Sequence, residues 1–434
     1  MDQIPYVETL PDDVRRRYRT YAIIASCFGC FGELLQDSSA IILLYFLALG
    51  AGESLTMFQT AFPGIASLVL LIPVSGFIAK YGPKKMIRLS CLIALTSYLF
   101  MASSPYFGTF GKYWCALWCL VFCSARIIWS GSWFPLLQYI LLPRERAPFF
   151  GLLRFTYHIF IGVIFFAVGS FMDKNTPIWF LQIVIVGAGL LAWGRWLFMK
   201  KIVIPDQPEA TVYDLKKALG ISLRNAPLVM FSVYVCFLMA ACAAISPFTI
   251  LYLKKGLGCG DNMVQILSTI TIAGNVTGFF CYSRIDRAIG TKWLQLGGHF
   301  SFILLLLGLA CCGKDVPHAV GIVSVLLFLC NFVWAIIYAS ISSEMLALSR
   351  PGNTTMASAF CQTYQQLGMA TGRTISSLLI GGNILAAFWD FHGMTVSSYQ
   401  SIFLIFAAIA IFSLALIFCI PSVIPRHDAE YYNP

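Results

Sequence analysis

The feature that most constrains this chain is a long apolar run, residues 21–49, that carries Glu33, Gln36 and Asp37 near its middle. The run is long enough to cross a bilayer as one helix. At about 100° per residue, the three polar side chains share one face of that helix. An ionised carboxylate at the bilayer centre costs roughly 2.5–3.5 kcal/mol. This face must therefore meet a cation, a proton or water inside the protein, because lipid offers none of them.

The rest of the chain repeats this apolar pattern. Only 11% of the 434 residues are charged and 59% are hydrophobic, which leaves too little polar surface for a soluble globule of this size. The runs have the length of membrane-spanning helices and not of barrel strands. We predict an all-α integral membrane protein whose twelve transmembrane helices lie at about residues 21–49, 54–79, 86–104, 113–142, 148–172, 177–199, 227–253, 262–282, 293–312, 318–345, 355–388 and 398–420.

The spacing of these runs divides the chain into two halves. Residues 1–199 are predicted to form one six-helix bundle and residues 226–434 a second, pseudo-symmetric one. Residues 200–225 are polar and contain an amphipathic segment, Tyr213–Leu219, with two lysines. We interpret this stretch as a cytoplasmic linker that lies on the membrane surface.

The positive charge of the chain is explained by membrane topology. Most of the 29 Lys and Arg residues fall in the N-terminus, the even-numbered loops, the linker and the C-terminus. By the positive-inside rule, both termini are cytoplasmic, in a plasma or inner membrane. The net charge of +10 therefore does not indicate a nucleic-acid partner. All cysteines except Cys259 lie in apolar runs, so no disulfide framework is expected.

Two short turns carry glycine and basic residues at matching places in the two halves. They lie between spans 2 and 3 (Gly76, Gly82, Lys84, Lys85) and between spans 8 and 9 (Asp286, Arg287, Gly290, Lys292). With the six-plus-six arrangement, they resemble the major facilitator superfamily over essentially the whole chain. That family has glycine, three residues, Asp-Arg, one residue, glycine and then basic residues in the first of these turns. The second turn here is one residue too long, and the first is one residue short and lacks the acid.

The resemblance implies alternating access, in which two bundles rock about a central site lined mainly by spans 1, 4, 7 and 10. It also implies gating roles for Gly82, Lys84, Asp286, Arg287 and Gly290. Glu344, near the inner end of span 10, is expected to join this cytoplasmic gate through Arg350 or Arg287.

Proton coupling is predicted for Asp37, Glu33, Arg126 and His158. A carboxyl group in a poorly hydrated site can load or release a proton when a nearby arginine moves. Asp37 is favoured because members of the resembled family that couple protons to sugars often keep an Asp in span 1 facing an Arg in span 4. The alternatives are a fixed ion pair for the acids and a buried neutral histidine for His158.

Substrate binding is predicted for two groups of residues inside spans. Arg126 shares a helix stripe with Trp129 and Trp133, which suits a solute cavity. Arg373 shares a stripe with Gln362 and Gln366, and this set could hold a carboxylate or sugar hydroxyls. Asn331 and Tyr338 in span 10 could hydrogen-bond the solute. The alternatives are structural ion pairs and polar contacts between helices. Arg126, Arg154 and Arg373 are the arginines placed inside spans.

These observations predict a secondary transporter that moves a small polar solute, either an organic anion, a sugar acid or a sugar. The predicted mechanism is symport with protons, with sodium as the other coupling ion considered. We predict no enzyme activity, cofactor or metal site, and a functional monomer in the lipid bilayer. The rival functions are an exporter or antiporter of amphiphilic compounds and a membrane receptor that does not transport.

Overall fold

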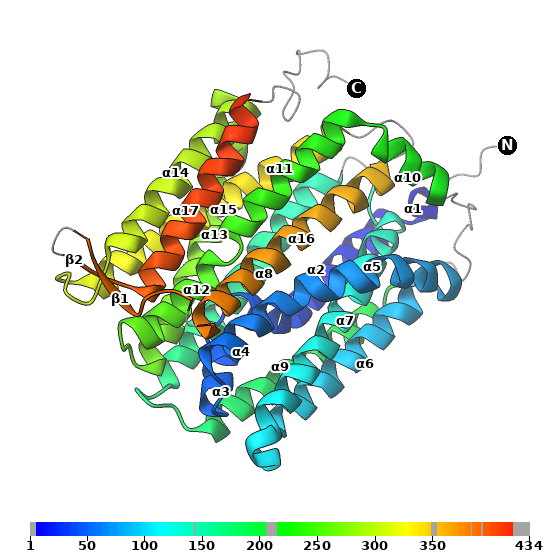
Figure 1. Ribbon diagram of the computed structural model, residues 1–434. Coiled ribbons are helices and arrows are strands. Elements are labelled where there is room, and N and C mark those ends of the chain that lie inside the picture. The colour runs from blue at the N-terminus through cyan, green and yellow to red at the C-terminus, as the bar shows by residue number, and fades with distance from the viewer. Residues whose placement is uncertain are drawn as a thin grey trace. The chain divides into compact units, whose positions relative to one another are not determined.

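The protein is almost entirely helical (Figure 1). The computed structural model describes residues 6–142, 145–204, 215–348, 354–382, 384–391 and 394–419. The chain divides into two compact units, whose bounds also take in residues outside these ranges. Unit 1 comprises Met1–Ala51, Ala66–Thr211 and Asp261–Ile266, and unit 2 comprises Gly52–Ile65, Val212–Gly260 and Leu267–Pro434.

The described helices confirm the prediction of an α-helical membrane protein. Ten of them are long and apolar enough to cross a membrane, and a bent pair near the N-terminus makes eleven. The remaining predicted span corresponds to α16 (Thr354–Gly381), a helix of 28 residues that is more polar than the others. Its length still suffices to cross a bilayer of about 30 Å.

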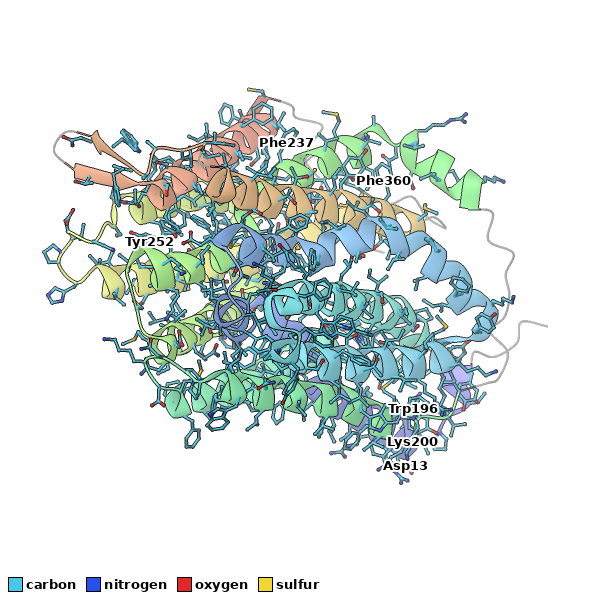
Figure 2. All side chains as sticks on the ribbon, turned by 60° about the horizontal axis from the view of Figure 1, so that its bottom comes forward. Asp13, Trp196, Lys200, Phe237, Tyr252 and Phe360 are labelled. Carbon is cyan, nitrogen blue, oxygen red and sulfur yellow. The ribbon has the colours of Figure 1, made fainter. Side chains whose placement is uncertain are left out.

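Unit 1 contains most of the first half of the chain. Within it α2 packs on α8 and α9, and α6 packs on α7 and α9. Figure 2 shows Asp13, at the start of α2, close to Trp196 and Lys200 at the end of α9, so these two helices run antiparallel. Its helices are α1 (Tyr6–Thr9), α2 (Asp12–Asp37), α3 (Ile41–Ala48), most of α5 (Phe62–Tyr81), α6 (Pro83–Ala102), η2 (Ser104–Phe110), α7 (Gly111–Gln138), α8 (Arg146–Phe171) and α9 (Ile178–Met199).

Unit 2 repeats this packing with the second half of the chain. Here α11 packs on α16 and α17, and α14 packs on α15 and α17. Its elements are α4 (Glu53–Phe58), η1 (Gln59–Ala61), α10 (Leu215–Leu223), α11 (Ala226–Cys242), α12 (Ile245–Leu251), η4 (Tyr252–Gly256), most of α13 (Asp261–Ile289), α14 (Thr291–Cys311), α15 (Ala319–Ala347), α16, β1 (Phe388–Phe391), β2 (Met394–Ser397) and α17 (Ser398–Cys419).

Two glycines show the internal repeat at the level of the backbone. Gly82 precedes α6 with φ 83° and ψ 150°, and Gly290 precedes α14 with φ 79° and ψ 152°. This region of φ/ψ space is open essentially to glycine alone. The two halves therefore make the same sharp turn between corresponding helices.

The prediction of one unbroken helix over residues 21–49 was wrong. Helix α2 ends at Asp37, α3 begins at Ile41, and the two are bent by 52°. Ser38 and Ser39 follow Asp37, and short polar side chains compete with the helix for backbone groups. The Ser39 hydroxyl accepts a hydrogen bond from the Ile41 amide at 3.1 Å. The sequence therefore carries its own local reason to break here.

The prediction of a span over residues 355–388 was also wrong at its end. Helix α16 ends at Gly381, and residues 388–397 form an antiparallel hairpin that pairs Phe388 with Ser397. Strand β2 contacts α17, and Figure 1 shows the hairpin beside one end of that helix. Gly381 and Gly382 disfavour helix, whereas the aromatic residues that follow favour strand.

The predicted amphipathic segment of the linker appears in part. Helix α10 begins at Leu215 and ends at Leu223, and it packs on α11 and α16. Tyr213 lies outside the described residues, as do Arg350 and the C-terminal tail from residue 420.

Candidate functional site

The two acids of α2 lie one helical turn apart inside unit 1. Glu33 and Asp37 occupy positions i and i+4, so their carboxylates project from the same face. Each is paired with an arginine from a different helix, Asp37 with Arg126 of α7 and Glu33 with Arg195 of α9. The polar face predicted from the sequence thus has cationic partners within the bundle.

The pair of Asp37 and Arg126 was expected from the sequence. Oδ2 of Asp37 lies 2.5 Å from a terminal nitrogen (NH2) of Arg126, and the side chains are 21% and 27% exposed. The other terminal nitrogen, NH1, is buried and has no hydrogen-bond partner among the described residues. Next to this pair, Gln36 donates to the sulfur of Cys123 at 3.4 Å, a second link between α2 and α7. Arg126 thus retains one donor that could serve an oxygen ligand.

The pair of Glu33 and Arg195 was not expected. Oε1 of Glu33 lies 2.7 Å from Arg195, whose side chain is only 6% exposed. The guanidinium carbon of Arg195 also lies 3.7 Å from the ring centroid of Trp129, a cation–π contact. Arg195 is close to the end of α9, where a basic residue usually extends toward the membrane surface. The sequence held one indication of this second pair. Glu33 and Asp37 share one helix face and each needs a cation, a proton or water as its partner, but only Arg126 was predicted as a cationic partner.

A glycine makes room for Arg195. A Cβ atom at Gly29, one turn before Glu33, would lie 1.4 Å from Nε of Arg195. The guanidinium therefore lies directly across the backbone of α2. A cavity of about 10 Å³, room for about one water molecule, adjoins both ion pairs. It is lined by Gly29, Glu33, Ser90, Cys91, Ala94, Phe122, Ala125, Arg126, Ala192 and Arg195.

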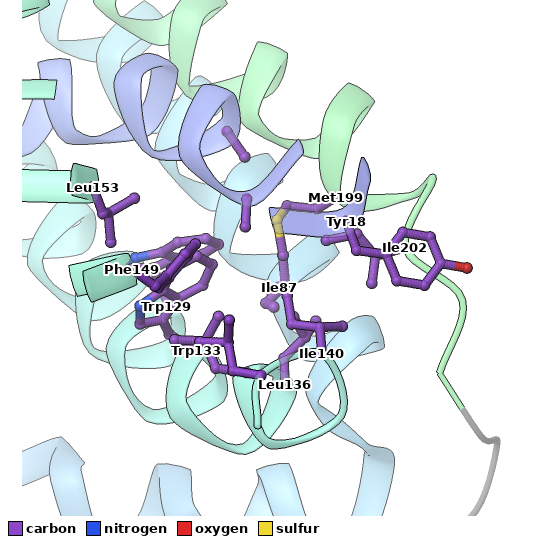
Figure 3. Packing of buried hydrophobic residues seen from close by; sticks show 14 of the residues in the cluster. Tyr18, Ile87, Trp129, Trp133, Leu136, Ile140, Phe149, Leu153, Met199 and Ile202 are labelled. Carbon is purple, nitrogen blue, oxygen red and sulfur yellow. The ribbon is translucent and has the colours of Figure 1, made fainter. Parts of the chain in front are cut away.

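Trp129 and Trp133 are packed in the apolar interior of unit 1. Both are buried, their rings stack at 4.8 Å, and they belong to an apolar cluster with Leu136 and Phe149 among its members. Figure 3 shows the two indoles enclosed by these aliphatic and aromatic side chains. Helical periodicity predicted a shared stripe correctly but could not tell a solute-facing stripe from a packed one. The structure favours the packed one.

His158 lies on α8 and contacts its own helix. Its Nδ1 lies 2.8 Å from the carbonyl oxygen of Arg154, one turn earlier, and its ring stacks on Tyr157. The side chain is buried. These contacts match the alternative of a histidine satisfied by local hydrogen bonding more closely than they match a proton relay.

Arg373 forms hydrogen bonds to the backbone at two helix ends within unit 2. Its Nε donates to the carbonyl oxygen of Ala243 at 3.1 Å, just after α11, and NH1 donates to that of Thr60 at 2.5 Å, in η1. Carbonyls at helix ends lack partners in their own helix. Arg373 supplies those partners through Nε and NH1, and these bonds match a structural role more closely than a substrate contact.

The other predicted substrate ligands lie in unit 2, where Gln362, Asn331 and Tyr338 each make separate contacts. Gln362 is exposed, with its amide near Ser358, and Gln366 is half-buried. Asn331 is buried, accepts from Ser246 at 3.0 Å and donates to the carbonyl of Leu327. Tyr338 is half-buried and stacks on Trp334 with centroids 5.9 Å apart. Of these side chains, Tyr338 with its tryptophan most resembles a surface for a flat polar ligand.

The predicted gating residues make contacts inside their own units. Lys84 donates to the carbonyl oxygen of Ile202 at 2.7 Å. Asp286 accepts from the hydroxyl of Thr291 at 2.9 Å. Arg287 is exposed and donates to the carbonyl of Ser283 in its own helix, whereas Glu344 is buried. Gly82 and Gly290 form the matching turns described above.

The two halves of the chain repeat one pattern of helix packing, and two acids of α2 pair with arginines of other helices. Both features can be compared with known proteins. The family model of the Major Facilitator Superfamily matches residues 26–373, most of the chain. The chain belongs to the major facilitator superfamily. It is therefore a multi-pass membrane protein and a secondary transporter of a small molecule.

Solved transporters share this fold. A mutant form of the nucleoside transporter NupG is 16% identical, with 94% of this chain and 100% of the other covered and a TM-score of 0.72. A D-xylose-proton symporter is 14% identical over 94% and 98% of the two chains, with a TM-score of 0.70. A bacterial homologue of the iron transporter ferroportin is 10% identical over 93% and 98%, also at 0.70. No curated protein matches the sequence. At these identities the solved structures establish the fold of the transporter and not its solute.

Proposed function

We propose that this transporter carries a small polar solute in symport with protons, and that Asp37 is the proton site. The observation that carries the proposal is the ion pair of Asp37 and Arg126, 2.5 Å apart at the end of α2, where the first span breaks. A proton can replace the guanidinium as the partner of the carboxylate, which frees the arginine for another acceptor. Loading a proton is thereby linked to a change in what Arg126 binds.

The second pair supports a division of roles between the two acids. Arg195 holds Glu33 by a charge-assisted hydrogen bond and is itself held by Trp129 and by the backbone at Gly29. Each arginine keeps one buried nitrogen without a hydrogen-bond partner among the described residues, NH1 of Arg126 and Nε of Arg195. The contrast rests on packing, because the Arg126 side chain is 27% exposed and that of Arg195 only 6%. Glu33 is thus the more tightly fixed of the two acids, and Asp37 is the better candidate for exchange with solvent protons.

The solute class follows from the same donor. A guanidinium with a donor to spare binds a carboxylate oxygen or a sugar hydroxyl. We therefore retain sugars, sugar acids and organic anions as the candidate solutes, with Arg126 as the contact proposed in unit 1. Arg373 is reassigned to a structural role. The distribution of basic residues supports cytoplasmic termini.

The test uses the purified transporter in liposomes. Uptake of radiolabelled sugars, sugar acids and organic anions is screened under an imposed inward proton gradient, and in parallel under a sodium gradient. Asp37→Asn is expected to abolish accumulation driven by the gradient and to retain solute exchange at equal concentrations, because only coupling needs the proton site. Asp13→Asn is the matched control, since Asp13 lies on the same helix and its side chain is 71% exposed.

Two results would contradict the proposal. Unchanged accumulation in Asp37→Asn would remove this residue from coupling. Accumulation that responds to sodium and not to protons would replace the coupling ion while leaving the transport function in place.

A further inference from the structure

The break between α2 and α3 exposes backbone groups in the interior of unit 1. A broken helix at membrane depth is tolerated only where protein satisfies the freed backbone groups. Gln265, in the second turn of α13, fills that role: its Oε1 accepts from the Ser39 hydroxyl and from the Ala40 amide, both at 3.0 Å. Gln265 is fully buried. The break is therefore bridged by one side chain from a helix far away in the sequence.

The start of α13 is itself anchored in unit 1. The carboxylate of Asp261 accepts from the amide of Thr176 at 2.8 Å, and the Asp261 amide donates to the carbonyl of Lys174 at 2.9 Å. A Cβ atom at Gly169 of α8 would lie 2.9 Å from the Ile266 side chain, so α8 and α13 meet closely there. These contacts fix the position from which Gln265 reaches the break.

The bridged residues directly follow the proposed proton site. Asp37 is the last residue of α2, and Ser39 and Ala40 are the residues that Gln265 binds. Whatever fixes residues 38–40 also fixes the direction in which the Asp37 side chain leaves the backbone. The charged and titratable groups on the surrounding elements include Glu33 on α2, Arg126 and Cys123 on α7, Arg154 and His158 on α8, Arg195 on α9 and Asp261 on α13.

We propose that Gln265 is a positioning residue for proton coupling. It locks the break at residues 38–40 so that Asp37 stays against Arg126, and it ties this lock to α13, which continues to Ile289 in unit 2. The coupling part of this inference rests on the proposed function; the locking part does not. A conformational change that displaces the start of α13 would release the break and change the contact between Asp37 and Arg126.

A second glutamine offers a matched control. Oε1 of Gln400 accepts from the amide and the hydroxyl of Ser397, both at 2.8 Å, and its Nε2 donates to the carbonyl of Ala310. Gln265 makes the same kind of bonds, with Nε2 near the carbonyl of Phe165 at 3.5 Å. Both side chains are buried. Gln400, however, caps the start of α17 in unit 2 and does not belong to the proposed site.

The locking part is tested by hydrogen exchange, which needs no substrate. In the purified transporter, Gln265→Leu is expected to speed amide exchange of residues 39–42 at least tenfold, because the Ala40 amide loses its acceptor. Gln400→Leu should leave these amides unchanged. Gln265→Glu keeps an acceptor oxygen in the position of Oε1 and should retain slow exchange. Unchanged exchange in Gln265→Leu, or equal acceleration in Gln400→Leu, would overturn the proposal.

The coupling part is tested in the liposome assay with the solute found by the screen. Gln265→Leu is expected to shift the pH dependence of uptake and to lower accumulation severalfold, whereas Gln400→Leu keeps the wild-type pH profile. A wild-type pH profile in Gln265→Leu, alongside accelerated exchange, would overturn the link to Asp37. If the wild-type protein accumulates nothing in response to protons, the proposed function has failed, and the exchange experiment still decides whether Gln265 locks the break.

Discussion

At the scale of single residues, each acid in the middle of the first span has an arginine of its own. Glu33 and Asp37 each face one guanidinium, and these four groups sum to zero charge. Removing one member of a buried pair typically costs about 3–5 kcal/mol, because the remaining charge stays in a poorly hydrated place. The position of each arginine therefore matters as much as its presence, and for Arg195 that position depends on a glycine.

Replacing Gly29 by alanine should destabilise the transporter by about 3 kcal/mol, since the new methyl group would overlap Arg195 and push it from Glu33. The readout is the unfolding temperature of the purified protein. Gly187→Ala is the control, because a Cβ atom at Gly187 meets nothing within 4 Å. If the effect acts through Arg195, Gly29→Ala should cost much less in an Arg195→Met background. An equal cost in both backgrounds would contradict this explanation.

At the scale of secondary-structure elements, the predicted spans were reliable in their middles and unreliable at their breaks. The apolar runs of α6, α9, α14 and α17 were located within a few residues. The break after Asp37 and the end of α16 were missed, because a short polar or glycine-rich sequence inside an apolar run does not by itself end a helix. It ends one when tertiary partners form hydrogen bonds to the freed backbone groups. Gln265 accepts from the Ala40 amide, and Arg373 donates to the Ala243 carbonyl.

The matching turns before α6 and α14 should respond alike to substitution. Gly82→Ala and Gly290→Ala each force a side chain into a φ/ψ region that costs about 1–3 kcal/mol, so each should lower the unfolding temperature by a similar amount. Gly76→Ala serves as the control, since Gly76 lies in helix α5 and a Cβ atom there meets nothing within 4 Å. A loss in only one of the two turn variants would argue against an equivalent role in the two halves.

At the scale of the whole molecule, the two compact units do not coincide with the two halves of the sequence. Residues 52–65 belong to unit 2, where the Ser54 hydroxyl donates to the carbonyl of Ser377 at 3.0 Å. Residues 261–266 belong to unit 1, where Asp261 and Gln265 make the contacts described above. Each unit thus includes a segment from the opposite half. The predicted bundles, residues 1–199 and 226–434, were drawn from composition. That they fold as two domains stays a prediction.

Dividing the chain within the linker should test this exchange of segments. Fragments 1–209 and 210–434, expressed separately, should each aggregate on size-exclusion chromatography, because each unit lacks a segment that completes it. Expressed together, they should yield a monodisperse complex with an unfolding temperature close to that of the intact protein. Fragment 1–209 as a stable, monodisperse protein on its own would show that residues 261–266 are dispensable for unit 1.

The sequence by itself determined that this chain is a helical membrane protein with an internal repeat. The family resemblance added the prediction of a transporter in which Asp37 faces Arg126 of span 4. Apolar length, helical period and charge placement follow from interactions with the bilayer, which act on every segment separately. Only the tertiary structure decided that Arg195 pairs with Glu33, that Trp129 and Trp133 are packed, and that Arg373 and Gln265 hold helix breaks. Those outcomes depend on which distant helices meet and at what depth, and periodicity within one helix carries no information about its neighbours.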